Sequence, residues 1–99
     1  MSAKQNILSF LKENKGMFLS KFHITKIGLF GSFARDEEKA ESDIDILIAR
    51  EPGTKNIYDL DWELRELLKK QFNRDIDICT EKYIKPYCRQ YILRDVIYV

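Results

Sequence analysis

The chain has 99 residues, 44% of them hydrophobic and 33% charged, which suits one globular domain spanning residues 1–99. Its formal net charge is +1, so it lacks the basic excess that direct nucleic-acid binding uses. No signal peptide begins the chain and no apolar stretch approaches the ~20 residues of a membrane span, so we expect a cytoplasmic protein that is not bound to a membrane.

The first half of the chain predicts helix followed by strand. Apolar residues recur at three- and four-residue spacings over residues 3–22, which indicates two short helices, or one helix broken near Gly16. Residues 24–30 predict a strand. Residues 33–36 fit one helical turn, and residues 36–42 read as a polar loop.

The second half continues the alternation. Residues 43–49 predict the clearest strand, and their nearly continuous apolar run suits a strand covered on both faces. A turn at residues 51–53 precedes an amphipathic helix over residues 57–72. Residues 75–79 predict a third strand, and residues 85–99 a last helix that ends in a short apolar tail. The fold class is therefore α/β (α+β), with a small mixed sheet and flanking helices.

The cysteine and histidine content argues against a zinc site. Cys79 and Cys88 are nine residues apart, which fits no metal-ligand spacing, and His23 is the only histidine. We expect two reduced, partly buried thiols and a histidine that lies in a loop or on the surface.

Gly31 and Ser32 follow the first predicted strand. Glycine can adopt positive φ and allow close backbone approach, so this turn can direct N–H groups at an anion, and Ser32 adds a hydroxyl donor. A helical turn that begins at Phe33 would add its own N–H groups. The same dipeptide is common in turns with only a structural role, so the turn alone leaves both interpretations open.

Two carboxylates stand at the start of the second strand. Side chains at i and i+2 of a strand share a face, so Asp43 and Asp45 lie side by side, with Cα atoms ~6–7 Å apart. Two ionised carboxylates this close repel each other, and a divalent cation such as Mg²⁺ relieves the repulsion. The alternative is that both are exposed at the strand end, with Asp43 paired to a lysine.

A third acid lies in the last predicted strand. Asp77 stands between Ile76 and Ile78, where an acid is costly to bury without a compensating charge. If this strand pairs beside the Asp45 strand, Asp77 reaches the same cation, and three carboxylates can hold two metal ions for phosphoryl transfer. Asp75 shares the face and competes for the role, although its neighbours favour Asp77.

Together these motifs resemble the DNA polymerase β-type nucleotidyltransferase superfamily, whose pattern is Gly-Ser, a spacer, Asp-x-Asp and a distal acid. Here GS is followed by nine residues, then SDID, and later RDIDI. The chain is most similar to the small prokaryotic members, the minimal nucleotidyltransferases (MNT), from ILSFLKENK through IGLFGSFAR and SDIDILI to YILRDVIYV. One departure is Asp36, which stands where that family commonly has glycine.

The resemblance implies a nucleotidyltransferase fold and a role for each motif. Gly31 and Ser32 would bind the triphosphate of ATP. Asp43 and Asp45 would ligate both Mg²⁺ ions. Asp77 would ligate the catalytic metal and help to deprotonate the incoming hydroxyl.

The resemblance also makes Arg35, in the GSFAR segment, a further candidate for nucleotide binding. It could lean toward the phosphates. A surface salt bridge with Asp36, Glu38 or Glu41 is an equally good interpretation.

The resemblance also implies a function. MNT proteins resemble the antitoxin half of two-gene HEPN/MNT systems, in which AMP is moved from ATP onto a tyrosine of a HEPN ribonuclease toxin. We therefore expect a Mg²⁺-dependent protein adenylyltransferase that forms a hetero-oligomer with a HEPN partner. The alternatives are an antitoxin that acts by binding alone and a transferase for a small hydroxyl compound.

Three tyrosines near the end of the chain, Tyr83, Tyr87 and Tyr91, fall at helical spacing. Packing in the core or against a partner is the preferred interpretation of this face. If the face is exposed, it is a candidate partner surface.

Overall fold

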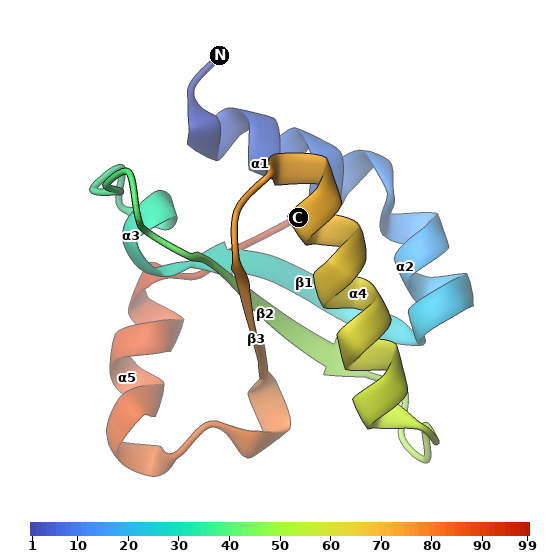
Figure 1. Cartoon of the computed structure of the whole chain (residues 1–99). Helices are drawn as coiled ribbons and strands as arrows, with labels where there is room; N and C mark the ends of the chain where they lie inside the picture. Colours follow the sequence, from blue (N-terminus) through green and yellow to red (C-terminus); the bar gives the residue numbers. More distant parts are fainter.

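A computed structural model describes all 99 residues of the chain. It has the element order that the sequence predicts, with η1 and β4 added, and the helical turn predicted at residues 33–36 begins earlier, at Gly31. In chain order the elements are α1 (Ala3–Glu13), α2 (Lys15–Phe22), β1 (Ile24–Phe30), α3 (Gly31–Ala34), β2 (Ile44–Arg50), α4 (Ile57–Phe72), β3 (Ile76–Thr80), the 3₁₀ helix η1 (Glu81–Tyr83), α5 (Pro86–Asp95) and β4 (Ile97–Tyr98) (Figure 1).

The four strands form one mixed sheet in the order β3-β2-β1-β4. β1 is antiparallel to both β2 and β4, whereas β2 and β3 are parallel. The crossover between the parallel strands contains α4, as expected for a connection of this kind. This arrangement confirms the predicted small mixed sheet with flanking helices.

The apolar tail after α5 does not extend a helix as the sequence led us to expect, because it forms β4 at the edge of the sheet. The close packing of β4 against β1 depends on Gly28 of β1. A Cβ atom at Gly28 would lie 2.8 Å from the carbonyl oxygen of Ile97 and 2.9 Å from a methyl carbon of Val96. The absence of a side chain at this position therefore makes room for the last strand.

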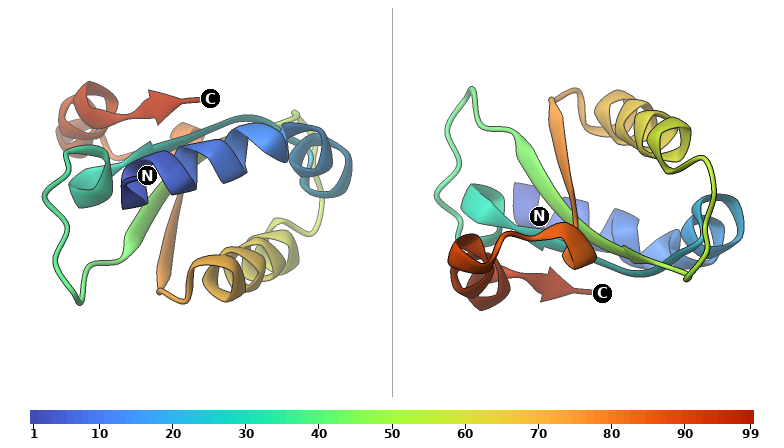
Figure 2. Two further views of the ribbon diagram at one scale, coloured as in Figure 1. Left: turned by 90° about the horizontal axis from the view of Figure 1, so that it is seen from above. Right: turned by 90° about the horizontal axis from the view of Figure 1, so that it is seen from below.

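The helices cover the two faces of the sheet unequally. α1, α2 and α4 lie on one face, and α5 lies on the other, beside β4 (Figure 2). Ile44, Ile46 and Ile48 alternate along β2 and join the main apolar core, which draws its other residues from α1, α2, α4 and the neighbouring strands. Asp45 alternates with them and therefore points to the face that carries α5. Leu47 on that face is also buried, so the middle of β2 is covered on both sides as predicted.

The break between the first two helices lies at Asn14, two residues before the predicted position at Gly16. Asn14 ends α1 with φ −108° and ψ 15°, and its side-chain amide donates a hydrogen bond to the carbonyl of Phe10 (2.8 Å). Gly16 lies within α2 and is exposed. Asparagine competes for local backbone groups in this way and is favoured where helices end.

Two further expectations concern reactive side chains. His23 is exposed, ends α2 in the left-handed conformation (φ 59°), and lies 3.2 Å from Glu51, which confirms a surface histidine. Both cysteines are free and half-buried, as predicted.

None of the helices has the length and apolar character needed to cross a membrane.

Candidate active site

The predicted motifs meet at one end of the sheet. Because β1 is antiparallel to β2, the end of β1 lies beside the start of β2, and Phe30 pairs with Asp45. Because β3 is parallel to β2, its start lies at the same end, and Asp45 pairs with Asp77. The Gly-Ser turn comes directly after Phe30. Strand pairing therefore brings together residues that are up to 46 positions apart in the sequence.

Gly31 occupies a position that other residues would fit poorly. Its φ is +75°, a conformation that is strained for residues with a Cβ atom. A Cβ atom here would also overlap Oδ2 of Asp45 and lie 2.9 Å from its Cγ. The turn thus packs its backbone directly against the Asp45 carboxylate. Ser32 follows in the first turn of α3 and is half-buried, and Phe33 anchors the segment in the core.

The Asp45 carboxylate is electrostatically perturbed. Burial, followed by the negative charges of Asp77 and Asp43, raises the pKa of Asp45 to about 6, although the Arg35 guanidinium lowers it. Asp43, just before β2, and Asp77 are both exposed, and Asp45 is half-buried between the Gly-Ser turn and β3. The structure therefore places all three predicted acids close enough to influence one another, with Asp45 at the centre.

The chemistry of these donors fits a hard divalent cation. Three carboxylates supply oxygen ligands of the kind that Mg²⁺ prefers, and burial together with their mutual repulsion raises the pKa of Asp45. However, the structure contains no group of three or more His, Cys, Asp or Glu side chains gathered tightly enough to hold a metal ion. Asp77 already contacts the Asp45 side chain, and the exposed Asp43 would have to turn toward them for all three to bind one cation.

Asp75 takes no part in this cluster. Its carboxylate lies 3.4 Å from Nζ of Lys69 on α4, and its carbonyl oxygen accepts a hydrogen bond from the N–H of Ile44. A polar hollow of about 340 Å³ lies next to it and is also bordered by Asp43 and Arg74. The geometry thus favours Asp77 over Asp75 as the third acid, in agreement with the prediction.

Arg35 forms an ion pair that the sequence did not suggest. Its Nη1 lies 2.8 Å from Oδ2 of Asp95 at the end of α5, and its Nε lies 3.1 Å from Glu37. None of the three predicted partners, Asp36, Glu38 and Glu41, is paired with it. The Asp95 side chain is only 13% exposed, and its hydrogen bond with the Arg35 guanidinium keeps the pKa of Asp95 below the ordinary value. The pair ties the Gly-Ser segment to α5, across 60 residues of sequence.

Two other residues shape the loop between α3 and β2. Arg74 donates hydrogen bonds from Nη1 to the carbonyl oxygens of Ala40 (3.0 Å) and Ser42 (2.9 Å), and its guanidinium stacks over the Phe33 ring. Sequence reasoning missed it, because nothing in its local pattern indicates a contact with this loop. Asp36 has φ 57°, which explains why glycine suits this position in the family that the chain resembles.

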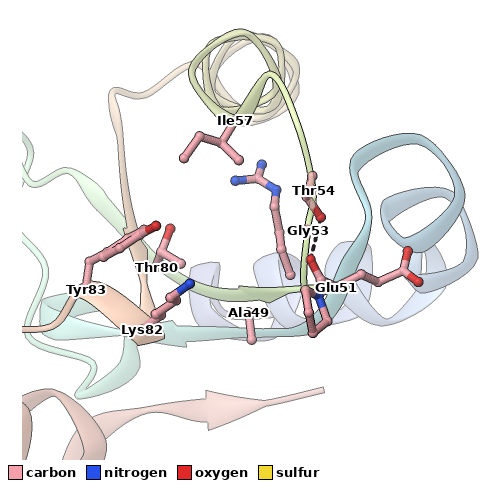
Figure 3. A pocket seen from close by; sticks show the side chains of 10 residues that line it. Ala49, Glu51, Gly53, Thr54, Ile57, Thr80, Lys82 and Tyr83 are labelled. Atoms are coloured by element: carbon pink, nitrogen blue, oxygen red, sulfur yellow. Dashed lines mark hydrogen bonds between the residues drawn. The ribbon is translucent and has the colours of Figure 1, made fainter.

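Other features of the molecule lie apart from this site. Burial raises the pKa of the Cys79 thiol, so it is no ready nucleophile at neutral pH. A cavity of about 220 Å³ lies at the far end of β2, near Ala49, roughly 13 Å from Asp45 along the strand (Figure 3). There the Glu51 side chain points away from the cavity, toward His23.

Comparison with known proteins agrees with this geometry. The sequence model of the family described as "Nucleotidyltransferase domain" matches residues 6–99. The chain is 31% identical to "Protein adenylyltransferase MntA" of Thermococcus cleftensis, over all of this chain and 98% of the relative. It is 35% identical over the full length of both chains to the protein MJ1379 of Methanocaldococcus jannaschii, which is provisionally named a protein adenylyltransferase.

Solved structures share the fold. A structure provisionally described as a minimal nucleotidyltransferase superposes with a TM-score of 0.77 at 24% identity, covering 97% of this chain and 95% of that one. A toxin–antitoxin structure with AMP-PNP superposes with a TM-score of 0.68 at 23% identity, covering 98% of this chain and 72% of that one. The match over residues 6–99 and the relatives that align along their whole length show that this chain belongs to the nucleotidyltransferase domain family.

Proposed function

We propose that this protein is a Mg²⁺-dependent protein adenylyltransferase that moves AMP from ATP onto a tyrosine hydroxyl of a HEPN-type toxin and thereby acts as its antitoxin in the cytoplasm. The observation that carries the proposal is the contact between the Gly31 turn and the Asp45 carboxylate, with Asp77 beside it in register. It places a phosphate-binding turn next to a set of carboxylates that lacks a counter-ion.

The comparisons support the choice of acceptor. Relatives that match this chain along its length are named protein adenylyltransferases. One structure with the same fold, at 22% identity and a TM-score of 0.59, is described as a tri-AMPylated HEPN toxin of Shewanella oneidensis in complex with an MNT antitoxin. We infer a hetero-oligomer of this chain with its own HEPN-type acceptor.

In the proposed reaction the acceptor hydroxyl oxygen attacks the α-phosphorus of ATP. A new oxygen–phosphorus bond forms, the bond between the α-phosphorus and its bridging oxygen to the β-phosphate breaks, and diphosphate leaves. Backbone N–H groups of Gly31 and Ser32 bind the triphosphate, and the Ser32 hydroxyl adds a donor. Asp77, the more exposed of the two paired acids, accepts the proton that the hydroxyl loses.

Asp43, Asp45 and Asp77 would hold Mg²⁺, which supplies neutralisation of phosphate charge when it is bound. Asp45 is the central ligand because it is fixed between the turn and β3. The remaining contribution of the protein is positioning: α3, β2 and β3 hold the phosphates and the acids in one geometry.

The test is transfer of label from ATP labelled at the α-phosphate to a purified HEPN-type toxin protein. Asp43→Asn and Asp45→Asn should lose transfer while they still bind that protein. Label transfer that persists in both variants would contradict the proposal.

An antitoxin that acts by binding alone remains the second candidate, and one observation favours it. The carboxylates are not gathered into a metal-holding group in the absence of a ligand. If wild type and Asp45→Asn neutralise the toxin equally and neither transfers label, this second function holds.

A further inference from the structure

An exposed aromatic surface lies on the last helix and the turn before it. Tyr83 of η1 and Tyr87 and Tyr91 of α5 are 63%, 69% and 56% exposed. Tyr87 and Tyr91 are four residues apart on α5, so they lie on the same side of that helix. Tyr83 precedes the helix and is joined to it by the extended residues Ile84 and Lys85. We call these three exposed side chains the tyrosine face. The opposite side of α5, including Cys88 and Ile92, is half-buried. Tyrosine is enriched at protein interfaces, and three exposed tyrosines within nine residues exceed the scatter expected of an ordinary surface.

The charge of this segment is one-sided. Residues 81–95 contain four cations and two acids. Both acids are engaged inside the molecule: Glu81 accepts a hydrogen bond from the Tyr98 hydroxyl (2.9 Å), and Asp95 binds Arg35. Arg94 also pairs with Asp95 (3.4 Å) and lies over the Tyr91 ring. The other three cations, Lys82, Lys85 and Arg89, are exposed and pair with no carboxylate, and Lys82 lies over the Tyr83 ring. The tyrosine face is therefore aromatic and positively charged.

The tyrosine face extends toward the candidate active site along α5, from Tyr83 near the cavity at the far end of β2 to Tyr91 near the end of the helix. α5 lies on the same side of the sheet as the Asp45 carboxylate, opposite α4 (Figure 2). Its last residue, Asp95, holds Arg35 at the end of the Gly-Ser segment. A protein that covers the tyrosine face would thus lie beside the carboxylates, which is where an acceptor hydroxyl must enter.

We propose that the tyrosine face is the docking surface for the protein acceptor, which covers it with an acidic patch. Charge complementarity selects an acidic protein, and the tyrosines supply the apolar anchors that carry most of the binding energy in such interfaces. The inference rests on the proposed function, because it names the surface through which that function reaches its acceptor.

The chain offers a matched control on α4. Tyr58 and Trp62 are also four residues apart on one helix and are 86% and 60% exposed, but they lie on the far side of the sheet. The test compares Tyr87→Ser/Tyr91→Ser with Tyr58→Ser/Trp62→Ser. A purified HEPN-type toxin protein is the probe, and calorimetry without ATP measures its binding. We expect binding to weaken at least about tenfold in the first variant and to change less than about twofold in the second.

Arg89→Glu tests the electrostatic part, because Arg89 is exposed on α5 and has no carboxylate partner that the substitution would release. It should weaken binding and reduce its dependence on salt concentration, because a cation that faces an acidic patch becomes an anion. Circular dichroism and thermal unfolding of each variant check that the fold is kept.

Several results would overturn the proposal. One is equal binding by the α5 variant and wild type, and another is loss of binding only in the α4 variant. A third is that the α5 variant loses binding to a single-stranded RNA oligonucleotide but keeps the HEPN protein. A fourth is that the tyrosine face joins two copies of this chain, seen as a dimer that Tyr87→Ser/Tyr91→Ser dissolves.

Failure of the docking surface and failure of the proposed function are distinguishable. If wild type binds the HEPN protein without transferring label, the proposed enzyme activity is contradicted and the proposed docking surface is not. If wild type and the α5 variant transfer label at equal rates, the proposed docking surface is contradicted and the proposed activity is not.

Discussion

Replacing Gly31 with alanine is expected to disable the candidate site and to destabilise the fold. The new Cβ atom would be placed at φ +75° and would overlap the Asp45 carboxylate. Gly53 provides a matched control, because its φ is +79° and a Cβ atom there has no other atom within 4 Å. The two substitutions therefore share the backbone strain and differ in the overlap.

The magnitudes follow from this difference. A left-handed conformation costs a residue with a Cβ atom ~1–2 kcal/mol, partly offset by ~0.4–1 kcal/mol because alanine is less flexible than glycine in the unfolded chain. We expect Gly53→Ala to lower the free energy of unfolding by about 1 kcal/mol. Overpacking against Asp45 adds ~1–3 kcal/mol, so Gly31→Ala should lower it by about 2–4 kcal/mol.

Activity should separate the two variants more clearly. Relief of the overlap moves Asp45, and a displacement of ~1 Å at a catalytic group can cost ~10²-fold in rate. Urea denaturation in EDTA measures the stability difference, and label transfer under conditions where both variants are folded measures the rate. Equal losses of stability in the two variants, with full transfer activity in Gly31→Ala, would refute this account of the turn.

Three further predictions concern single charges. In EDTA, urea denaturation should show that wild type loses roughly 1 kcal/mol of unfolding free energy relative to Asp45→Asn between pH 4 and pH 7. The pKa of Asp45 in the folded protein is raised to about 6, so its contribution to stability is complete below the ordinary pKa of an aspartate and is lost as pH rises through 6. Solvent screening makes the loss smaller than the full pKa shift implies. A constant difference across this range would contradict the raised pKa. Asp36→Gly should raise the free energy of unfolding by ~0.5–1 kcal/mol, because it removes strain at φ 57°, and an unchanged urea midpoint would argue against strain there. Asp95→Asn should raise KM for ATP more than it lowers kcat, because Arg35 then holds the Gly-Ser segment less firmly. Asp95→Glu should restore part of the lost activity. Equal kinetics in wild type and both variants would exclude a positioning role for Asp95.

Local patterns predicted most of the fold. Apolar periodicity located the long helix and the three main strands, since each buries a face with a regular repeat. β4 was missed because a strand of two residues has no period to detect, and its place depends on the missing side chain of Gly28. The helix break was placed at Gly16 instead of Asn14, because sequence alone does not show which polar side chain bonds to the backbone.

The candidate site was predictable where strand geometry dictates it. Alternation along a strand places Asp45 on the face opposite Ile44 and Ile46, and pairing of two such strands brings it beside Asp77. The pair between Arg35 and Asp95 was not predictable, because it joins segments whose contact depends on where α5 packs. Long-range ion pairs of this kind leave no spacing signal in the sequence.

The central claim is that the Asp45 carboxylate, held against the Gly31 turn beside Asp77, carries out transfer of AMP to a protein. The intact mass of the HEPN protein, measured after incubation with ATP, Mg²⁺ and this protein, tests it most directly. We predict an increase by one or more AMP units with wild type and none with Asp45→Asn or Asp77→Asn. An unmodified HEPN protein that wild type nevertheless inactivates, or equal modification by all three proteins, would contradict it.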